Sequence, residues 1–213
     1  MLELTSPLPP DSKLAELAED AYSPPYTWTG PGDERAKLTK VGDYYCVANQ
    51  GTTKDGLSIL RDLRACPWWN QYTGVSPAGF LKGALGMIDA MIFDLAEHAR
   101  AGRVIFIGHS LGGAMGNIEG GIFTALGHPP AAVVTFEPAR SGFWRLRRLL
   151  RQVPYAVYYD NGSQVPDVPP VYRHPTRRRF IGPPGIDPLD ELGRIKLHRI
   201  AFIRQRMAIA GVP

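Results

Sequence analysis

Residues 104–116, VIFIGHSLGGAMG, are the most informative stretch of the chain, because their pattern predicts a buried strand, a tight turn and a helix in succession. The unbroken apolar run over 104–107 is typical of a strand buried on both faces of a parallel sheet. Ser110 lies between Gly108 and Gly112, where small residues relieve the crowding of a strand-to-helix turn. The pattern favours a nucleophile held on a strained turn, and a purely structural turn is the alternative.

The rest of the chain alternates predicted helices with predicted strands. Strands are expected over 43–49, 131–138 and 155–160. Helices are expected over 13–21, 55–63, 77–100 and 145–151 and across most of 192–210. This alternation predicts an α/β fold, with a mostly parallel central sheet covered by helices on both faces.

The length of 213 residues and the hydrophobic fraction of 44% favour one compact domain over 1–213, with residues 1–35 as an N-terminal extension. An apolar run of about 18 residues, as a transmembrane helix needs, is missing from the sequence. The acidic, proline-broken start over 1–20 is not typical of a Sec signal peptide. We therefore expect a cytoplasmic protein, or one exported by a non-Sec route. Whether Cys46 and Cys66 pair is left open.

The chain has a net charge of +4, and its arginines cluster at 145–151 and 177–179. Such clusters are usually solvated, although they can attract anionic lipid or nucleic acid. Zinc-finger spacing, an RNA-binding aromatic signature and a phosphate-binding glycine–lysine loop are all missing from the sequence. The absence of these motifs therefore disfavours nucleic acid as the partner.

A nucleophilic serine needs a general base, and a third group must orient that base. In serine hydrolases with this strand–turn–helix the chain order is serine, acid, histidine. Three of the five histidines precede or adjoin the serine or its helix: His98, His109 and His128. His174 and His198 remain, and the late position of His198 favours it as the base; a surface histidine at a helix start is the alternative.

Several segments between about residues 41 and 207 resemble, in order, the class 3 (fungal-type) lipases of the α/β-hydrolase fold. VIFIGHSLGGA (104–114) is similar to that family's nucleophile elbow. Two segments before the elbow are similar to family motifs: VANQGTT (47–53) resembles FRGT, and GVSPAGF (74–80) resembles VHxGF. Three segments after it are similar too: VVTFEPAR (133–140) resembles VVTFGAPR, NGSQVPDVPP (161–170) resembles the loop that carries the acid, and KLHRIAFI (196–203) resembles the segment that carries the histidine. The resemblance implies a serine lipase or carboxylesterase that acts on lipid or short-chain esters, without a metal or cofactor.

The resemblance also assigns the oxyanion hole to Thr52, through its N–H and hydroxyl, and to the N–H of Leu111. Three positions depart from the family. Gln50 replaces an arginine, Ala78 replaces a histidine, and Ser163 stands where the catalytic aspartate belongs. A neutral hydroxyl stabilises an imidazolium far less than a carboxylate does.

Three carboxylates can replace the missing aspartate: Asp160, favoured because it ends a predicted strand, then Asp167 and Glu137. If none does, the chain is a catalytically weak or silent binding protein of the hydrolase fold.

Residues 54–74 are a candidate lid helix followed by an aromatic loop. Leu57 and Leu60 form an apolar strip beside Trp68 and Trp69, which predicts a lid that covers Ser110 in water and turns toward a lipid interface. An amphipathic helix packed on the core is the alternative. The sequence does not predict the oligomeric state.

Overall fold

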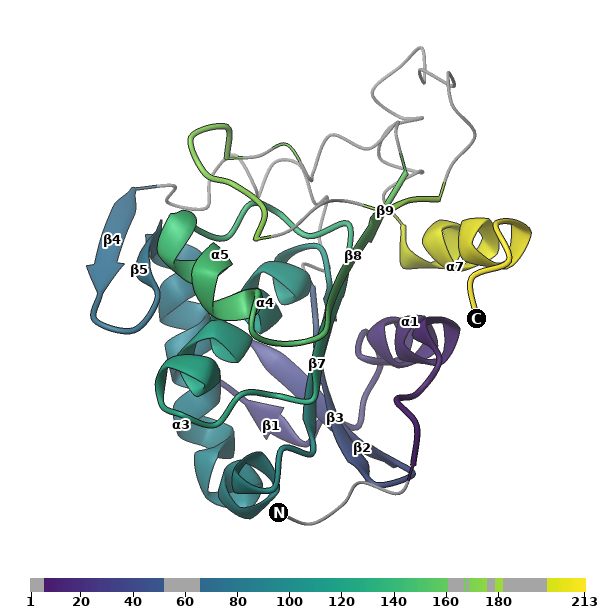
Figure 1. Ribbon diagram of the computed structural model, residues 1–213, viewed down its shortest axis with the longest axis horizontal. Coiled ribbons are helices and arrows are strands. Elements are labelled where there is room, and N and C mark those ends of the chain that lie inside the picture. Colours follow the sequence, from purple (N-terminus) through teal and green to yellow (C-terminus); the bar gives the residue numbers. More distant parts are fainter. Residues whose placement is uncertain (1–5, 52–65, 161–166, 168, 176–178, 182–198) are drawn as a thin grey trace.

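The computed structural model describes residues 6–51, 66–160, 167, 169–175, 179–181 and 199–213. Its centre is a seven-stranded sheet with the order β1-β2-β3-β6-β7-β8-β9 (Figure 1). The strands are β1 (Trp28–Thr29), β2 (Arg35–Val41), β3 (Tyr44–Asn49), β6 (Val104–His109), β7 (Ala132–Phe136), β8 (Tyr155–Tyr159) and β9 (Arg179–Phe180). All pairs from β3 to β9 are parallel and those among β1, β2 and β3 are antiparallel, which confirms the predicted mostly parallel sheet.

Helices cover both faces of this sheet, as predicted. On one face lie α3 (Ala78–Arg100), α4 (Leu111–Ala125) and α5 (Trp144–Leu150); on the other lie α1 (Asp11–Asp20) and α7 (Ile200–Ile209) (Figure 1). Alternate residues of β6 enter the two resulting cores: Phe106 packs in the α3–α4–α5 core, and Ile105 and Ile107 pack in the α1–α7 core. Because both faces of β6 are buried, its sequence is apolar without interruption over 104–107.

The stretch predicted as an aromatic loop forms a hairpin instead. Strand β4 (Pro67–Asn70) pairs antiparallel with β5 (Gly74–Pro77). The Asn70 side chain closes the turn, because its Oδ1 accepts the N–H groups of Tyr72 and Thr73 and its Nδ2 donates to the Gly74 carbonyl. The predicted lid helix over 55–63 lies outside the described residues.

No helix in the described ranges combines the length and the apolar character that crossing a bilayer requires.

Candidate active site

Ser110 joins β6 to α4 with φ 56° and ψ −124°, a conformation that costs free energy for a residue with a side chain. Its N–H donates to the Phe136 carbonyl at 3.0 Å. The flanking glycines permit this turn: a Cβ on Gly108 would lie 2.3 Å from the Gly112 carbonyl carbon, and one on Gly112 would lie 2.3 Å from the Asn49 carbonyl oxygen. The turn is therefore possible only with glycine at both positions.

The Ser110 side chain is 1% exposed, and its Oγ has no hydrogen-bond partner among the described residues. A buried hydroxyl without such a partner is uncommon in folded proteins, since burial removes the water that would otherwise bind it. Leu111 follows as the first residue of α4. The first N–H groups of a helix have no acceptor within it, and the helix dipole makes that end positive. The serine oxygen thus lies beside a site suited to a developing negative charge.

On the α1 side of the elbow, the Tyr22 hydroxyl lies 2.7 Å from His109 Nδ1. A Cβ on Gly51 would lie 2.1 Å from the same hydroxyl, so the loop after β3 passes directly against Tyr22. Burial raises the pKa of Tyr22, which keeps the phenol neutral. Tyr22 therefore connects the elbow to the residue preceding Thr52, and Thr52 itself lies outside the described residues.

A buried carboxyl–amide pair holds the end of β3 against α4. Asn49 Nδ2 donates to Glu119 Oε2 at 2.6 Å, and both residues are 0% exposed. Burial raises the pKa of Glu119 to about 8, and the hydrogen bond from Asn49 opposes part of that rise. Sequence reasoning missed this pair; its one signal was an acid within the apolar, small-residue stretch of the elbow helix.

The strands β6, β7 and β8 are neighbours, so Ser110, Glu137 and Asp160 follow three adjacent carboxyl ends of the sheet. Glu137 is 0% exposed with φ 48°, and its Oε1 accepts the Asp160 N–H at 2.5 Å. Asp160 is 4% exposed, and its Oδ2 lies 3.2 Å from Arg206 Nε on α7. Two of the three candidate carboxylates are therefore buried at the edge that carries the serine.

Asp167, the third candidate, differs from both. Its side chain is 54% exposed and forms an ion pair with Arg140 at 2.7 Å. An exposed carboxylate committed to a surface ion pair is poorly placed to act beside the buried Ser110. Ser163 lies outside the described residues.

Of the two candidate bases, only His174 is described. It is 8% exposed, and its ring stacks near Tyr159, the residue before Asp160, with 6.1 Å between ring centroids. His198 lies outside the described residues, directly before Arg199 and the start of α7. The assignment of the base to His198 stays a prediction.

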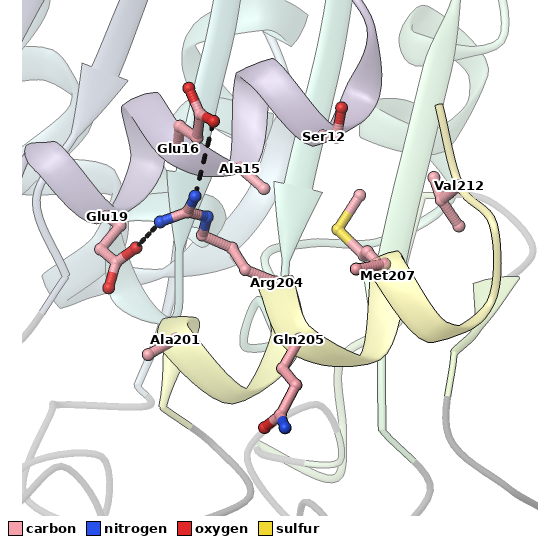
Figure 2. Close-up of a pocket in the computed structure, with 10 residues that line it drawn as sticks. Ser12, Ala15, Glu16, Glu19, Ala201, Arg204, Gln205, Met207 and Val212 are labelled. Atoms are coloured by element: carbon pink, nitrogen blue, oxygen red, sulfur yellow. Dashed lines mark hydrogen bonds and ion pairs between the residues drawn. The ribbon is translucent and has the colours of Figure 1, made fainter.

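Helix α7, which follows His198, is held at two points. Arg204 forms ion pairs with Glu16, at 3.5 Å, and with Glu19 on α1, beside a cleft of about 490 Å³ between the two helices (Figure 2). Arg206 contacts Asp160. Helix α7 is thereby fixed relative to α1 and to the end of β8.

The described residues contain no cluster of three or more histidine, cysteine, aspartate or glutamate side chains that could hold a metal ion. Cys46 and Cys66 are both free thiols, Cys46 buried and Cys66 exposed.

The family model described as Lipase (class 3) matches residues 47–172. No curated protein sequence matches this chain. Solved structures do, with low identity. The Rhizomucor miehei lipase propeptide complex is 15% identical, with a TM-score of 0.63, and the match covers 76% of this chain and 63% of that one. The chain thus spans less than two thirds of that relative's length.

Two further structures are similar. A triacylglycerol lipase from Penicillium expansum is 14% identical, with a TM-score of 0.62 over 79% of this chain and 77% of that one. A triacylglycerol lipase described as having a serine protease triad is 17% identical, with a TM-score of 0.65 over 76% and 74%. These likenesses confirm the predicted α/β-hydrolase-like fold.

Proposed function

The chain belongs to the class 3 lipase family, and from this premise we propose that it hydrolyses carboxylic esters through an acyl-enzyme formed on Ser110. The observation that carries the proposal is Ser110 itself: a buried hydroxyl on a strained turn, without a hydrogen-bond partner among the described residues, beside the N-terminus of α4. The triad reported for a triacylglycerol lipase of the same fold supports it.

In the proposed mechanism Ser110 Oγ attacks the ester carbonyl carbon while His198 accepts the hydroxyl proton. The carbonyl oxygen becomes an oxyanion, which accepts hydrogen bonds from the N–H of Leu111 and from the N–H and hydroxyl of Thr52. Each such donor contributes about 3–4 kcal/mol to the stabilisation of the transition state. His198 then gives the proton to the departing alcohol, and water hydrolyses the acyl-enzyme by the reverse sequence.

Asp160 is the proposed third member of the triad. It is buried at the end of β8, and it contacts α7, which directly follows the segment that contains His198. The Arg206 guanidinium balances its buried charge, and the Glu137 carboxylate orients its backbone by accepting its N–H. Glu137 is the second choice because it is equally buried and follows the adjacent strand.

The proposed substrates are lipid or short-chain esters, with the candidate lid and the exposed Trp68 and Trp69 meeting a lipid interface. One observation favours a second function. Ser163 occupies the position of the family's aspartate, so a catalytically weak or silent binding protein is the alternative.

The test is labelling with a fluorophosphonate probe, which reacts with an activated serine. Wild type and the control Ser12→Ala, which removes an exposed hydroxyl of α1, should be labelled, and Ser110→Ala should not. Turnover of short p-nitrophenyl esters at neutral pH should follow the same order. Equal labelling of wild type and Ser110→Ala would contradict the proposal. An ester turnover by wild type no faster than that of Ser110→Ala would favour the silent binding protein.

A further inference from the structure

Three tryptophan side chains are exposed on two neighbouring elements. Trp68 and Trp69 on β4 are 50% and 62% exposed, and Trp144, the first residue of α5, is 70% exposed. Exposed aromatic residues gathered in one region mark an interaction site more often than single exposed side chains do. Indole rings in particular favour the boundary between lipid headgroups and acyl chains, where one end of the ring is apolar and the other is hydrated.

The hairpin and α5 are fastened together. Arg145 on α5 donates from Nε to the Tyr72 carbonyl at 2.8 Å and from a terminal nitrogen to the Gln71 carbonyl at 2.6 Å, so it binds the turn of the hairpin. A Cβ on Gly74 would lie 3.3 Å from the Arg145 Cβ, which shows how closely β5 passes α5. Figure 1 shows the hairpin and α5 side by side. The three indoles are therefore carried by one packed unit.

The same unit is strongly basic. Arg147, Arg148 and Arg151 are exposed, and none of the three forms an ion pair within the described part of the chain. The Arg148 guanidinium lies 5.9 Å from the centre of the Trp144 ring. Neither residues 64–88 nor residues 138–159 contain an aspartate or glutamate. The positive charge of α5 is thus not neutralised by the segments that build this surface.

We propose that this tryptophan–arginine surface, formed by Trp144, Arg147, Arg148 and Arg151 on one face of α5 and by Trp68 and Trp69 on the adjoining hairpin, binds an anionic phospholipid surface. Trp68 and Trp69 are consecutive in β4, so their side chains leave opposite faces of the hairpin, and the lipid meets the hairpin at its edge. The arginines attract the phosphate groups, and the indoles enter the boundary between headgroups and acyl chains. Nucleic acid would also satisfy the arginines. Three large indoles on a folded surface fit the apolar layer beneath a lipid headgroup better than the uniformly polar backbone of a duplex.

Binding of lipid to this surface needs no catalytic residue. Only the idea that such binding brings an ester to Ser110 rests on the proposed function. Strand β7 ends at Phe136, and α5 begins at Trp144 after the loop that leaves this end of the strand. Trp144, at the start of α5, therefore follows the end of the sheet that carries Ser110.

Sedimentation with vesicles tests the proposal, and Ser110→Ala is used throughout so that the lipid is not hydrolysed. We expect binding to vesicles of phosphatidylcholine mixed with phosphatidylglycerol and much weaker binding to phosphatidylcholine alone. The combined change Arg147→Gln, Arg148→Gln and Arg151→Gln should weaken binding at least about tenfold. The matched control replaces three exposed cations on other elements, Lys13→Gln, Lys40→Gln and Arg100→Gln, and should retain binding.

The indoles are tested separately. Trp68→Ala, Trp69→Ala and Trp144→Ala should each weaken binding, and the blue shift of tryptophan emission on anionic vesicles should shrink. Thermal unfolding verifies that these exposed substitutions leave the fold intact. Three results would overturn the proposal: equal binding to both vesicle types, an equal loss in the lysine and arginine control, or variants that lose binding to a DNA duplex while vesicle binding is unchanged. A protein that binds anionic vesicles but never reacts with fluorophosphonate would contradict the proposed function alone.

Discussion

At the scale of single residues, the activity of three variants can identify which candidate carboxylate is the third member of the triad. We predict that Asp160→Asn lowers kcat more than Glu137→Gln, and that Asp167→Asn stays near wild type. The physical reason is burial: Asp160 is 4% exposed beside α7, whereas the Asp167 side chain is 54% exposed and bound to Arg140. Replacing a triad carboxylate by its amide can cost about 10⁴-fold in kcat. Hydrolysis of p-nitrophenyl butyrate by the three variants measures the effect.

Asp160→Asn also breaks the ion pair with Arg206, so loss of structure must be distinguished from loss of the acid. Arg206→Gln removes the same ion pair but keeps the carboxylate. If Arg206→Gln retains activity while Asp160→Asn does not, the carboxylate itself is needed. Near-wild-type rates in all three carboxylate variants would instead indicate a serine–histidine dyad.

At the scale of elements, the pair Asn49–Glu119 joins β3 to α4 and makes their junction sensitive to pH. The pKa of Glu119 is raised by burial from 4.5 to about 8 in the folded chain, so between these values the folded state binds a proton that the unfolded state has lost. The free energy of unfolding should therefore fall as pH rises through this window, by up to about 1.4 kcal/mol per pH unit. Glu119→Gln should remove that contribution. Urea unfolding at several pH values measures it.

The control for this prediction is Asp89→Asn, which replaces an exposed carboxylate on α3 and should leave the slope unchanged. In Glu119→Gln the new side-chain amide oxygen can still accept the hydrogen bond from Asn49, so the variant should fold. A slope that is identical in wild type and Glu119→Gln would show that this carboxyl is not the titrating group.

At the scale of the whole molecule, the candidate lid and the hairpin should make activity depend on the physical state of the substrate. We predict that hydrolysis of a long-chain ester rises when the substrate passes from dissolved to aggregated. Trp68→Ala combined with Trp69→Ala should lower that rise and spare short, soluble esters, because these indoles are 50% and 62% exposed on β4. Each indole that moves from water into the lipid contributes several kcal/mol to the free energy of binding, at roughly 25 cal/mol per Å² of apolar area.

Initial rates measured across the aggregation point of the substrate test this prediction. Phe93→Ala, which removes an aromatic side chain that is 91% exposed on α3, is the control and should keep the rise. Rates that follow the monomeric substrate smoothly through the aggregation point would contradict the lid and make the protein an esterase without interfacial activation.

The features that were predictable from the sequence depend on local sterics and on the burial of both faces of a strand. The elbow at Ser110 was predictable because only glycine fits at Gly108 and Gly112, and this requirement is written in neighbouring residues. The central strands were predictable because burial on both faces leaves an uninterrupted apolar run. The order of the family's segments then pointed to the hydrolase-like fold, which the comparisons confirm.

Features made by residues that are distant in sequence were not predictable, because they form only when the chain has folded. Strand β2 is mixed in polarity because it lies toward the antiparallel edge of the sheet, and it was missed for that reason. The sequence around Trp68 and Trp69 is typical of a loop, and it forms a strand only because its backbone pairs with β5. Glu119 meets Asn49, and Arg206 meets Asp160, only after the strands and helices have packed. Packing alone sets the burial and the charge around these groups, because neither is encoded within a local stretch of chain.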